Sequence, residues 1–186
     1  MGLLLKPSAW IVRWSHLLAP GAEVLDVACG SGRHLAWFSG QGHLVTGVDR
    51  DLELARQHAH HAELICADIE DGPWPFQVNG RPRHFGAVVV TNYLWRPLLP
   101  TIMDSVAPGG VLLYETFAAG NEVLGRPTRP DFLLQPGELL SVCAGLSVVA
   151  YESGYLSDPP RCVQRVAAVR LTGAADPRQL LDRCSL

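Results

Sequence analysis

Three aspartates occupy corresponding places in three successive apolar segments. Asp26 lies just inside the end of the first segment, while Asp49 and Asp68 end the second and third. In an open α/β sheet, ligands bind beyond the carboxyl ends of the strands, so these carboxylates converge on one crevice if the segments are parallel strands. A carboxylate accepts several hydrogen bonds, which suits the recognition of hydroxyl and amino groups. The spacing therefore predicts a binding site for a polar ligand.

A turn that contains two glycines follows the first of these segments. Residues 28–32 read Ala-Cys-Gly-Ser-Gly, and a helix is expected after them. Glycines let the backbone approach a ligand closely, and the amino terminus of the helix would face it. Alone, the turn is weak evidence, and Asp49 alone could be a helix cap, with Asp51 nearby. The turn and the three aspartates together favour a ligand site.

The periodicity of apolar residues predicts the elements that position this site. Strands are expected at 23–28, 43–49, 62–68, 85–92, 111–117, 146–153 and 163–171, and helices at 7–18, 33–41, 52–61, 97–106 and 136–144. A short loop joins the last two strands, which predicts an antiparallel edge pair. We expect an α/β fold with a doubly wound, seven-stranded, mostly parallel sheet, an antiparallel last strand and an extra N-terminal helix.

The 186 residues fit a single domain, since no repeat or domain boundary is evident. Residues 1–20 hold the N-terminal helix, and the proline- and glycine-containing segment 70–83 is expected to be a loop. Segment 118–135 is longer than ordinary connections and is therefore a candidate substrate loop. A tail is expected over residues 172–186.

Composition narrows the range of partners. The formal net charge is -3, without a basic run, which disfavours binding to nucleic acid. The five cysteines show no paired spacing, so we expect free thiols in a reducing cytoplasm. No apolar stretch reaches the length of a membrane span or of a signal-peptide core, so neither a membrane partner nor export is expected. The sequence does not predict an oligomeric state.

A histidine cluster invites a metal interpretation. His58 and His61 can share one helix face, with His60 beside them. They lack neighbouring carboxylate or cysteine ligands, and such clusters are usually solvated. We predict no metal site.

The motifs resemble those of a known family. The segment VLDVACGSGRH at 24–34 resembles motif I of the class I S-adenosylmethionine-dependent methyltransferases, and TGVDRD at 46–51, CADIEDGPW at 66–74, VVVTNYL at 88–94 and APGGVLLYETF at 107–117 resemble the later motifs in their usual order. The loop is similar in particular to that of small bacterial methyltransferases of the tellurite-resistance type. This resemblance implies a Rossmann-like methyltransferase fold, S-adenosylmethionine as cofactor and methyl transfer to a small molecule.

The resemblance also implies the cofactor-binding residues. They are Asp26, Ala28, Cys29, Gly30, Gly32, Asp49, Arg50, Asp68, Ile69, Thr91 and Asn92. In this assignment the glycine turn lies against the methionine part, with Asp26 at its amino group. Asp49 accepts hydrogen bonds from the ribose hydroxyls. Asp68 and the backbone of Ile69 bind the adenine, and residues 91–92 close the methionine end.

Two positions depart from the family pattern. Ala28 stands where the first glycine of the loop is usual, and a Cβ is tolerated there if φ is negative. The Asn-Pro-Pro-Tyr signature of amino methyltransferases is replaced by Thr-Asn-Tyr-Leu at 91–94. This difference argues against a DNA base or a protein amide as acceptor.

The residues that would act on the acceptor are the last part of the predicted site. The cofactor carries an activated methyl group, so the protein mainly aligns the acceptor and excludes water. If a general base exists, the candidates are His34, Tyr93 and Glu115, although the interpretation of each as a packing or capping residue is favoured. The substrate candidates are Trp10, Tyr93 and Arg126. The N-terminal helix is either a lid over the cofactor or a packing element.

Two alternatives come from other functional classes. A nicotinamide-dependent oxidoreductase would need a third glycine where Leu35 stands, and it leaves Asp26 and Asp68 unexplained. A non-catalytic, cofactor-binding regulatory protein could use the same fold, because a fold does not fix a function. Cofactor binding without turnover on any acceptor would distinguish that second alternative.

Overall fold

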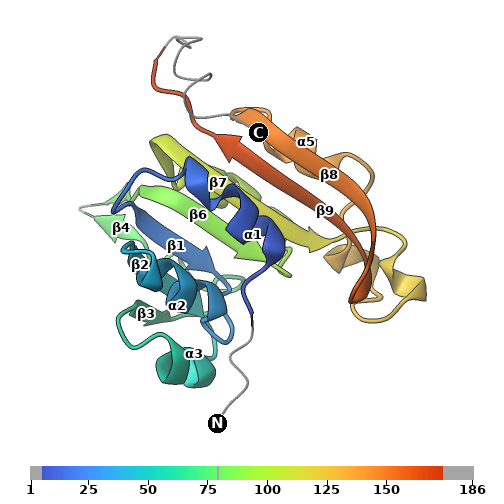
Figure 1. The fold of residues 1–186 in the computed structure, drawn as a ribbon, viewed down its shortest axis with the longest axis horizontal. Coiled ribbons are helices and arrows are strands. Elements are labelled where there is room, and N and C mark those ends of the chain that lie inside the picture. Colours follow the sequence, from blue (N-terminus) through green and yellow to red (C-terminus); the bar gives the residue numbers. More distant parts are fainter. Residues whose placement is uncertain (1–5, 79, 174–186) are drawn as a thin grey trace.

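A seven-stranded sheet forms the centre of the computed structural model, which describes residues 6–78 and 80–173. Its strands are β1 (Glu23–Val27), β2 (Leu44–Asp49), β3 (Glu63–Cys66), β6 (Phe85–Thr91), β7 (Val106–Phe117), β8 (Ser147–Ser157) and β9 (Pro160–Val169). Their order is β3-β2-β1-β6-β7-β9-β8 (Figure 1). The five neighbouring strands β3, β2, β1, β6 and β7 are parallel to one another. Strand β9 pairs antiparallel with both β7 and β8. The predicted fold class is confirmed.

Helices cover both faces of the sheet. They are α1 (Ala9–Trp14), α2 (Arg33–Gly40), α3 (Glu53–His58), α4 (Leu99–Asp104) and α5 (Glu138–Val142). Successive strand residues point to opposite faces, so Val24 packs with residues of α1 and α2, while Leu25 packs with residues of α4 and α5. Parallel strands buried on both faces need such near-continuous apolar runs. The sheet edge at the carboxyl ends of its parallel strands is left free for a site.

The element boundaries differ from the expected ones in several places. The expected loop 70–83 contains a small antiparallel hairpin, β4 (Gln77–Val78) with β5 (Arg81–Pro82). Strands β8 and β9 are longer than predicted and leave only residues 158–159 as their turn. Backbone pairing carries both strands past the end of β7 through polar residues, which the search for apolar runs could not detect. Short 3-10 turns, η1 (Ser15–Leu17) and η2 (Arg96–Leu98), stand where longer helices were expected.

Both ends of the chain lie outside the described residues. Residues 1–5 and 174–186 are not among the described residues, so the predicted tail 172–186 lies almost wholly outside them. Within the described part, none of the helices has the length and hydropathy needed to cross a membrane.

Candidate active site at the carboxyl ends of the strands

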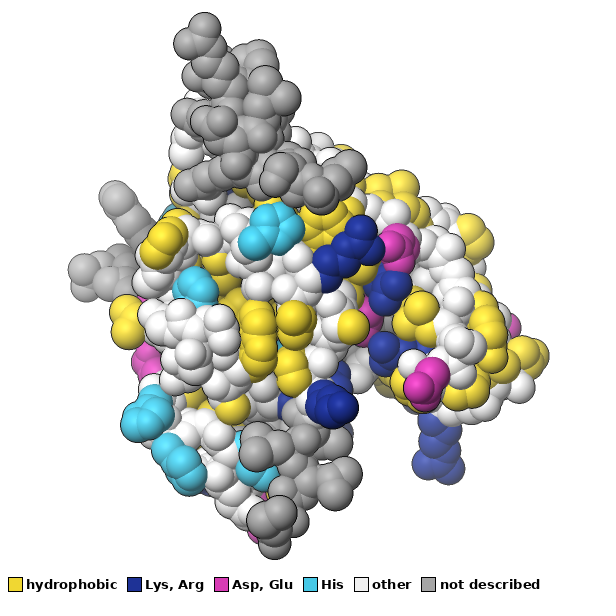
Figure 2. Space-filling view, viewed as in Figure 1, with side chains coloured by type: hydrophobic (Ala, Val, Ile, Leu, Met, Phe, Trp, Pro, Cys, Tyr) yellow, Lys and Arg dark blue, Asp and Glu magenta, His cyan; other side chains and the backbone are white. Residues whose placement is uncertain are grey.

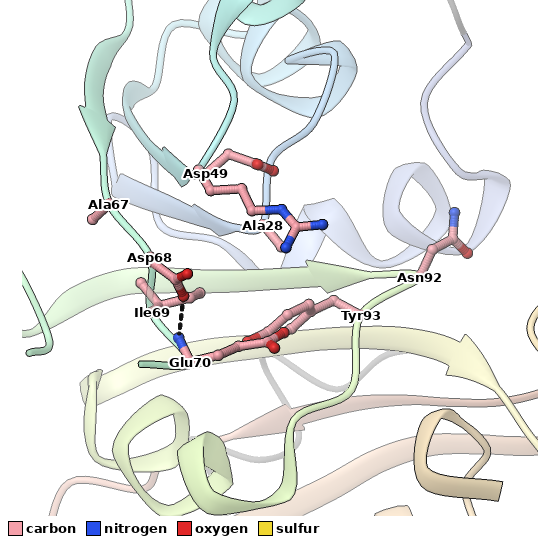
Figure 3. A pocket seen from close by; sticks show the side chains of 9 residues that line it. Ala28, Asp49, Ala67, Asp68, Ile69, Glu70, Asn92 and Tyr93 are labelled. Atoms are coloured by element: carbon pink, nitrogen blue, oxygen red, sulfur yellow. Dashed lines mark hydrogen bonds between the residues drawn. The ribbon is translucent and has the colours of Figure 1, made fainter. Parts of the chain in front are cut away.

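A cavity of about 280 Å³ opens beyond the carboxyl ends of β1, β2, β3 and β6 (Figure 3). It is lined by Ala28, Asp49, Arg50, Ala67, Asp68, Ile69, Glu70, Asn92 and Tyr93. Strand β1 lies between β2 and β6, where the strand order reverses, which is the usual ligand position in such sheets. Six of the residues predicted to bind the cofactor thus meet in one cavity.

Asp49 joins the first two strand ends. Its Oδ2 accepts the backbone N–H of Gly30 at 2.8 Å, and its Oδ1 accepts that of Asp51 at 3.1 Å. Figure 3 shows the carboxylate at the cavity, on the side of the turn that follows β1. Both oxygens can accept further hydrogen bonds, so the side chain is held in place for a ligand with paired hydroxyls.

The glycine turn is fixed by close packing. Gly32 has φ +73°, and a Cβ at this position would lie 3.1 Å from Cα of Ala55 in α3. A side chain here would be strained in both respects. Cys29 points into the core, and burial, followed by the charges of Asp26 and Asp49, raises the pKa of its thiol. Gly30, Gly32 and Cys29 therefore shape the turn from outside the cavity lining.

The backbone conformation of Ala28 is not the negative-φ conformation that a Cβ at this position tolerates. Its φ is +55°, not negative, and Asn92 has φ +56°. Among the residues that the structure describes, these are the two positive-φ positions without glycine, and both line the cavity. Such conformations cost roughly 1–3 kcal/mol and cluster at functional sites.

Asp68 lies two residues beyond β3. Its Oδ1 accepts the backbone N–H groups of Glu70 at 2.9 Å and Asp71 at 3.2 Å. These hydrogen bonds lower the pKa of the Asp68 carboxyl, with a smaller contribution from the charge of Arg50. The exposed carboxylate is thus kept ionised at the rim.

A buried polar network lies behind this cavity. Asp26 is buried, and neither of its carboxylate oxygens has a hydrogen-bond partner among the described residues. His34 Nδ1 lies 3.7 Å from Asp26 Oδ2, while His34 Nε2 accepts the backbone N–H of Ser8 at 3.1 Å. An accepting Nε2 places the proton of a neutral imidazole on Nδ1, toward Asp26. His34 thus connects the N-terminal segment to β1.

Glu115 is tied into the same network. Its Oε1 accepts Ser8 Oγ–H at 3.2 Å and pairs with Arg161 at 3.1 Å, and its Oε2 pairs with Arg165 at 3.4 Å. The charges continue outward through Glu152, which pairs with Arg165 and with Arg13 of α1. Figure 2 shows Lys and Arg side chains gathered along the hollow between the α1–α2 and β8–β9 sides. Glu115 is thus held by two guanidinium groups.

A second cavity, of about 260 Å³, adjoins the first. It is lined by Glu70, Asn92, Tyr93, Leu94, Thr116, Phe117, Pro127 and Phe132. The two cavities share Glu70, Asn92 and Tyr93. Pro127 and Phe132 come from segment 118–135, the predicted substrate loop. The sequence analysis did not name Glu70, Leu94, Thr116 or Phe117 as site residues, because only the fold brings these segments together beside Tyr93.

Arg96 anchors that loop. From η2, its guanidinium pairs with Glu138 of α5 at 2.7 Å and donates to the main-chain oxygens of Asp131 at 2.7 Å and Leu133 at 2.9 Å. Glu138 Oε2 also accepts the Gln135 N–H at 2.7 Å. The end of the loop is therefore held against α5.

Other predicted residues lie outside both cavities. His34 and Glu115 belong to the buried network, and Trp10 packs in the core, where its Nε1–H donates to the Val166 carbonyl at 3.2 Å. Arg126 is exposed beside Pro127, and Thr91 ends β6. The roles assigned to these residues remain predictions.

The N-terminal helix and the histidine cluster have simple local surroundings. Helix α1 packs on the sheet face, and the preceding Ser8 reaches the strand ends. His58 Nδ1 lies 3.0 Å from the main-chain oxygen of Ser31. The lid and the absence of a metal likewise remain predictions.

Comparison with known proteins agrees with this geometry. Residues 24–110 match the family model described as a methyltransferase domain. The chain is 33% identical over 111 residues to a malonyl-[acyl-carrier protein] O-methyltransferase from Serratia marcescens, covering 55% of this chain and 41% of that protein. It is 46% identical over 56 residues to a thiopurine S-methyltransferase from Pseudomonas putida, covering 27% and 26%. The chain thus spans well under half the length of these relatives.

The fold also resembles solved structures of methyltransferases. TehB from Haemophilus influenzae superposes with a TM-score of 0.69 at 17% identity, covering 89% of this chain and 63% of that one. Together with the matched domain, this confirms the resemblance that the motifs predicted. Residues 24–110 therefore match a methyltransferase domain, and the fold is similar to that of S-adenosylmethionine-dependent methyltransferases.

Proposed function

We propose that this protein is an enzyme that transfers the methyl group of S-adenosylmethionine to a small-molecule acceptor. One observation carries the proposal: six predicted cofactor-binding residues line a single cavity, and a second cavity adjoins it through three shared residues. The expected location is the cytoplasm, the compartment that the unpaired cysteines favour.

The residues fit this cofactor chemically. Asp26 is a buried carboxylate whose oxygens lack hydrogen-bond partners, and such a group calls for a cationic or donor group such as the cofactor's amino group. Asp49 suits the ribose diol, and Asp68 with the backbone of Ile69 suits the adenine edge. When bound, the cofactor supplies a methyl group already activated by its sulfonium.

The chain's own contribution is positioning. Asn92 and Tyr93 lie between the two cavities, where they can orient an acceptor toward the first. Loop 118–135, anchored by Arg96, contributes Pro127 and Phe132 to the wall of the second cavity. Alignment of the two reactants accelerates such a transfer.

The acceptor is proposed to be small. The relatives named above are methyltransferases of a thiopurine and of a malonyl group on a carrier protein, and both names support an acceptor other than nucleic acid. The volume of the second cavity, about 260 Å³, suits a compact molecule.

Calorimetric titration tests the cofactor first. The wild type should bind S-adenosylmethionine and its demethylated product, S-adenosylhomocysteine, but neither NAD nor NADP. Asp49→Ala should bind about 100-fold more weakly, since hydrogen bonds to a charged group contribute about 1.5–3 kcal/mol each. Asp71→Ala, at the same rim but outside both cavities, is the control. Binding of NAD instead, or of neither cofactor, would contradict the proposal.

Turnover then separates the enzyme from a non-catalytic binding protein. Formation of S-adenosylhomocysteine would be measured against a panel of thiols, phenols, amines, carboxylates and oxyanions. Acceptor-dependent product supports the enzyme. Tight cofactor binding without product on any acceptor would favour the regulatory alternative.

A further inference from the structure

The second cavity has a lining of one dominant character. Tyr93, Phe117 and Phe132 contribute aromatic rings, and Leu94 and Pro127 contribute aliphatic surface. Such walls bind flat apolar molecules by stacking and by burial of their surface. The lining therefore favours an aromatic ligand.

The charge around this cavity is negative. Glu70 lines it, while no Lys, Arg or His of the described residues does. Glu70 also lines the first cavity beside Asp49 and Asp68, and the cation there, Arg50, does not reach the second. Like charges about 4 Å apart repel by about 1 kcal/mol in water and by more where water is excluded. The cation next to this wall, Arg129, stacks on the Phe132 ring at 5.2 Å and is paired with Asp131 at 2.7 Å, so an anionic ligand would still meet this repulsion.

Tyr93 adds a neutral donor to the same wall. Its hydroxyl oxygen is buried without a hydrogen-bond partner among the described residues, and its main-chain oxygen accepts Tyr114 O–H at 2.8 Å. Burial, followed by the charge of Glu70 and the more distant aspartates, raises the pKa of Tyr93. The hydroxyl thus stays protonated and neutral, and Figure 3 shows the Glu70 side chain, whose carboxylate can accept hydrogen bonds, beside the Tyr93 ring.

We propose that the second cavity binds an uncharged aromatic acceptor, and that Glu70 selects it by accepting a hydrogen bond from its nucleophilic O–H or N–H and by repelling anions. The proposal rests on the proposed methyltransferase function. It places carboxylates and oxyanions outside the substrate range.

A pair of probes that differ by one charge tests this. Protein saturated with S-adenosylhomocysteine would be titrated with methyl 4-hydroxybenzoate, an uncharged phenol, and with 4-hydroxybenzoate, its anionic counterpart. The wild type should bind the ester at least about tenfold more tightly, equivalent to about 1.4 kcal/mol. Glu70→Gln should reduce this ratio to below about threefold, because the repulsion of the anion is removed.

Two further variants control the interpretation. Glu122→Gln changes an exposed acid of loop 118–135 that lines neither cavity, so it should keep the wild-type ratio. Phe132→Ala should weaken binding of the ester by about tenfold through loss of a stacking wall. Since every variant is titrated in the saturated state, differences in cofactor affinity do not enter the ratio.

Each remaining outcome contradicts the proposal. Equal or tighter binding of the anion, an unchanged ratio in Glu70→Gln, or no binding of either probe at millimolar concentration would overturn it. Failure of S-adenosylhomocysteine to bind would instead overturn the proposed function, and that titration is made first, on the protein alone.

Discussion

At the scale of single residues, the site is built from side chains held in unusual environments. Asp26 is buried with no hydrogen-bond partner for its oxygens among the described residues, and Ala28 and Asn92 adopt left-handed backbone conformations. Each of these features costs folding free energy. Such costs are expected at a ligand site. Substitutions at these positions can therefore raise the stability of the protein at the expense of its function.

Ala28 provides a direct test of this strain. Ala28→Gly should raise the free energy of unfolding by about 0.5–1 kcal/mol, because glycine adopts φ +55° without steric cost. The measurement is urea denaturation followed by circular dichroism.

The matched control is Ala36→Gly within α2. It should lower the free energy of unfolding by about 1 kcal/mol, since glycine is unfavourable inside a helix. A destabilised Ala28→Gly variant would show that the backbone at this position is not strained.

At the scale of elements, short segments are fixed by a few polar side chains. Ser8 caps α1 by accepting the Trp10 N–H at 3.2 Å, and it bonds to both His34 and Glu115. Arg96 and Glu138 fix the end of loop 118–135. Helices of five or six residues are too short to be stable alone, so these contacts and packing determine where they lie.

Removal of the Ser8 hydroxyl should loosen the N-terminal segment. Ser8→Ala should lower the free energy of unfolding by about 1–2 kcal/mol, because α1 loses its cap and Glu115 loses a buried donor. Ser15→Ala, which removes an exposed hydroxyl from the end of the same segment, should change it by less than about 0.5 kcal/mol. Equal effects of the two substitutions in denaturant titrations would contradict the role of Ser8.

The Arg96–Glu138 pair should make stability depend on pH. Arg96 and the Gln135 N–H lower the pKa of Glu138 despite its partial burial. A lowered pKa in the folded state stabilises the protein above the unfolded pKa of about 4.3, and this contribution disappears as pH falls through the folded value.

Glu138→Gln should therefore lower the free energy of unfolding by about 1 kcal/mol at pH 7 and by much less near pH 3. Urea denaturation at both pH values measures the difference. A cost that is the same at pH 3 and pH 7 would show that the ion pair does not contribute.

At the scale of the whole molecule, the sheet order places the ends of β1, β2 and β6 side by side and brings the loop after β7 next to them. Any ligand that binds across these ends stabilises the native state as a unit. The effect follows from mass action, since the unfolded chain has no such site.

S-adenosylhomocysteine should therefore raise the melting temperature. At 100 times its Kd the stabilisation is about 2.7 kcal/mol, which corresponds to roughly 5–10 °C for a chain of this size. Differential scanning fluorimetry measures the shift, with NADH as the control ligand. A shift with NADH, or the same shift in Asp49→Ala as in the wild type, would contradict the proposed site.

The sequence by itself determined the parts of the protein that are encoded locally. Apolar runs of β-branched residues predicted all seven strands of the main sheet, because buried parallel strands need such runs. The position of Asp49 at the end of its run predicted its place at the rim, and the glycine turn predicted the start of α2. These features depend on residues close together in the chain.

Only the tertiary structure decided the rest, since it depends on contacts between distant segments. The positive φ of Ala28 was not evident from the local sequence, and the extra length of β8 and β9 results from pairing across strands. Glu70 and Phe132 are 62 positions apart in the chain, and only the folded sheet brings them to one cavity. Local sequence patterns carry no information about contacts between distant segments, because the same segment can pack against a different partner in another fold.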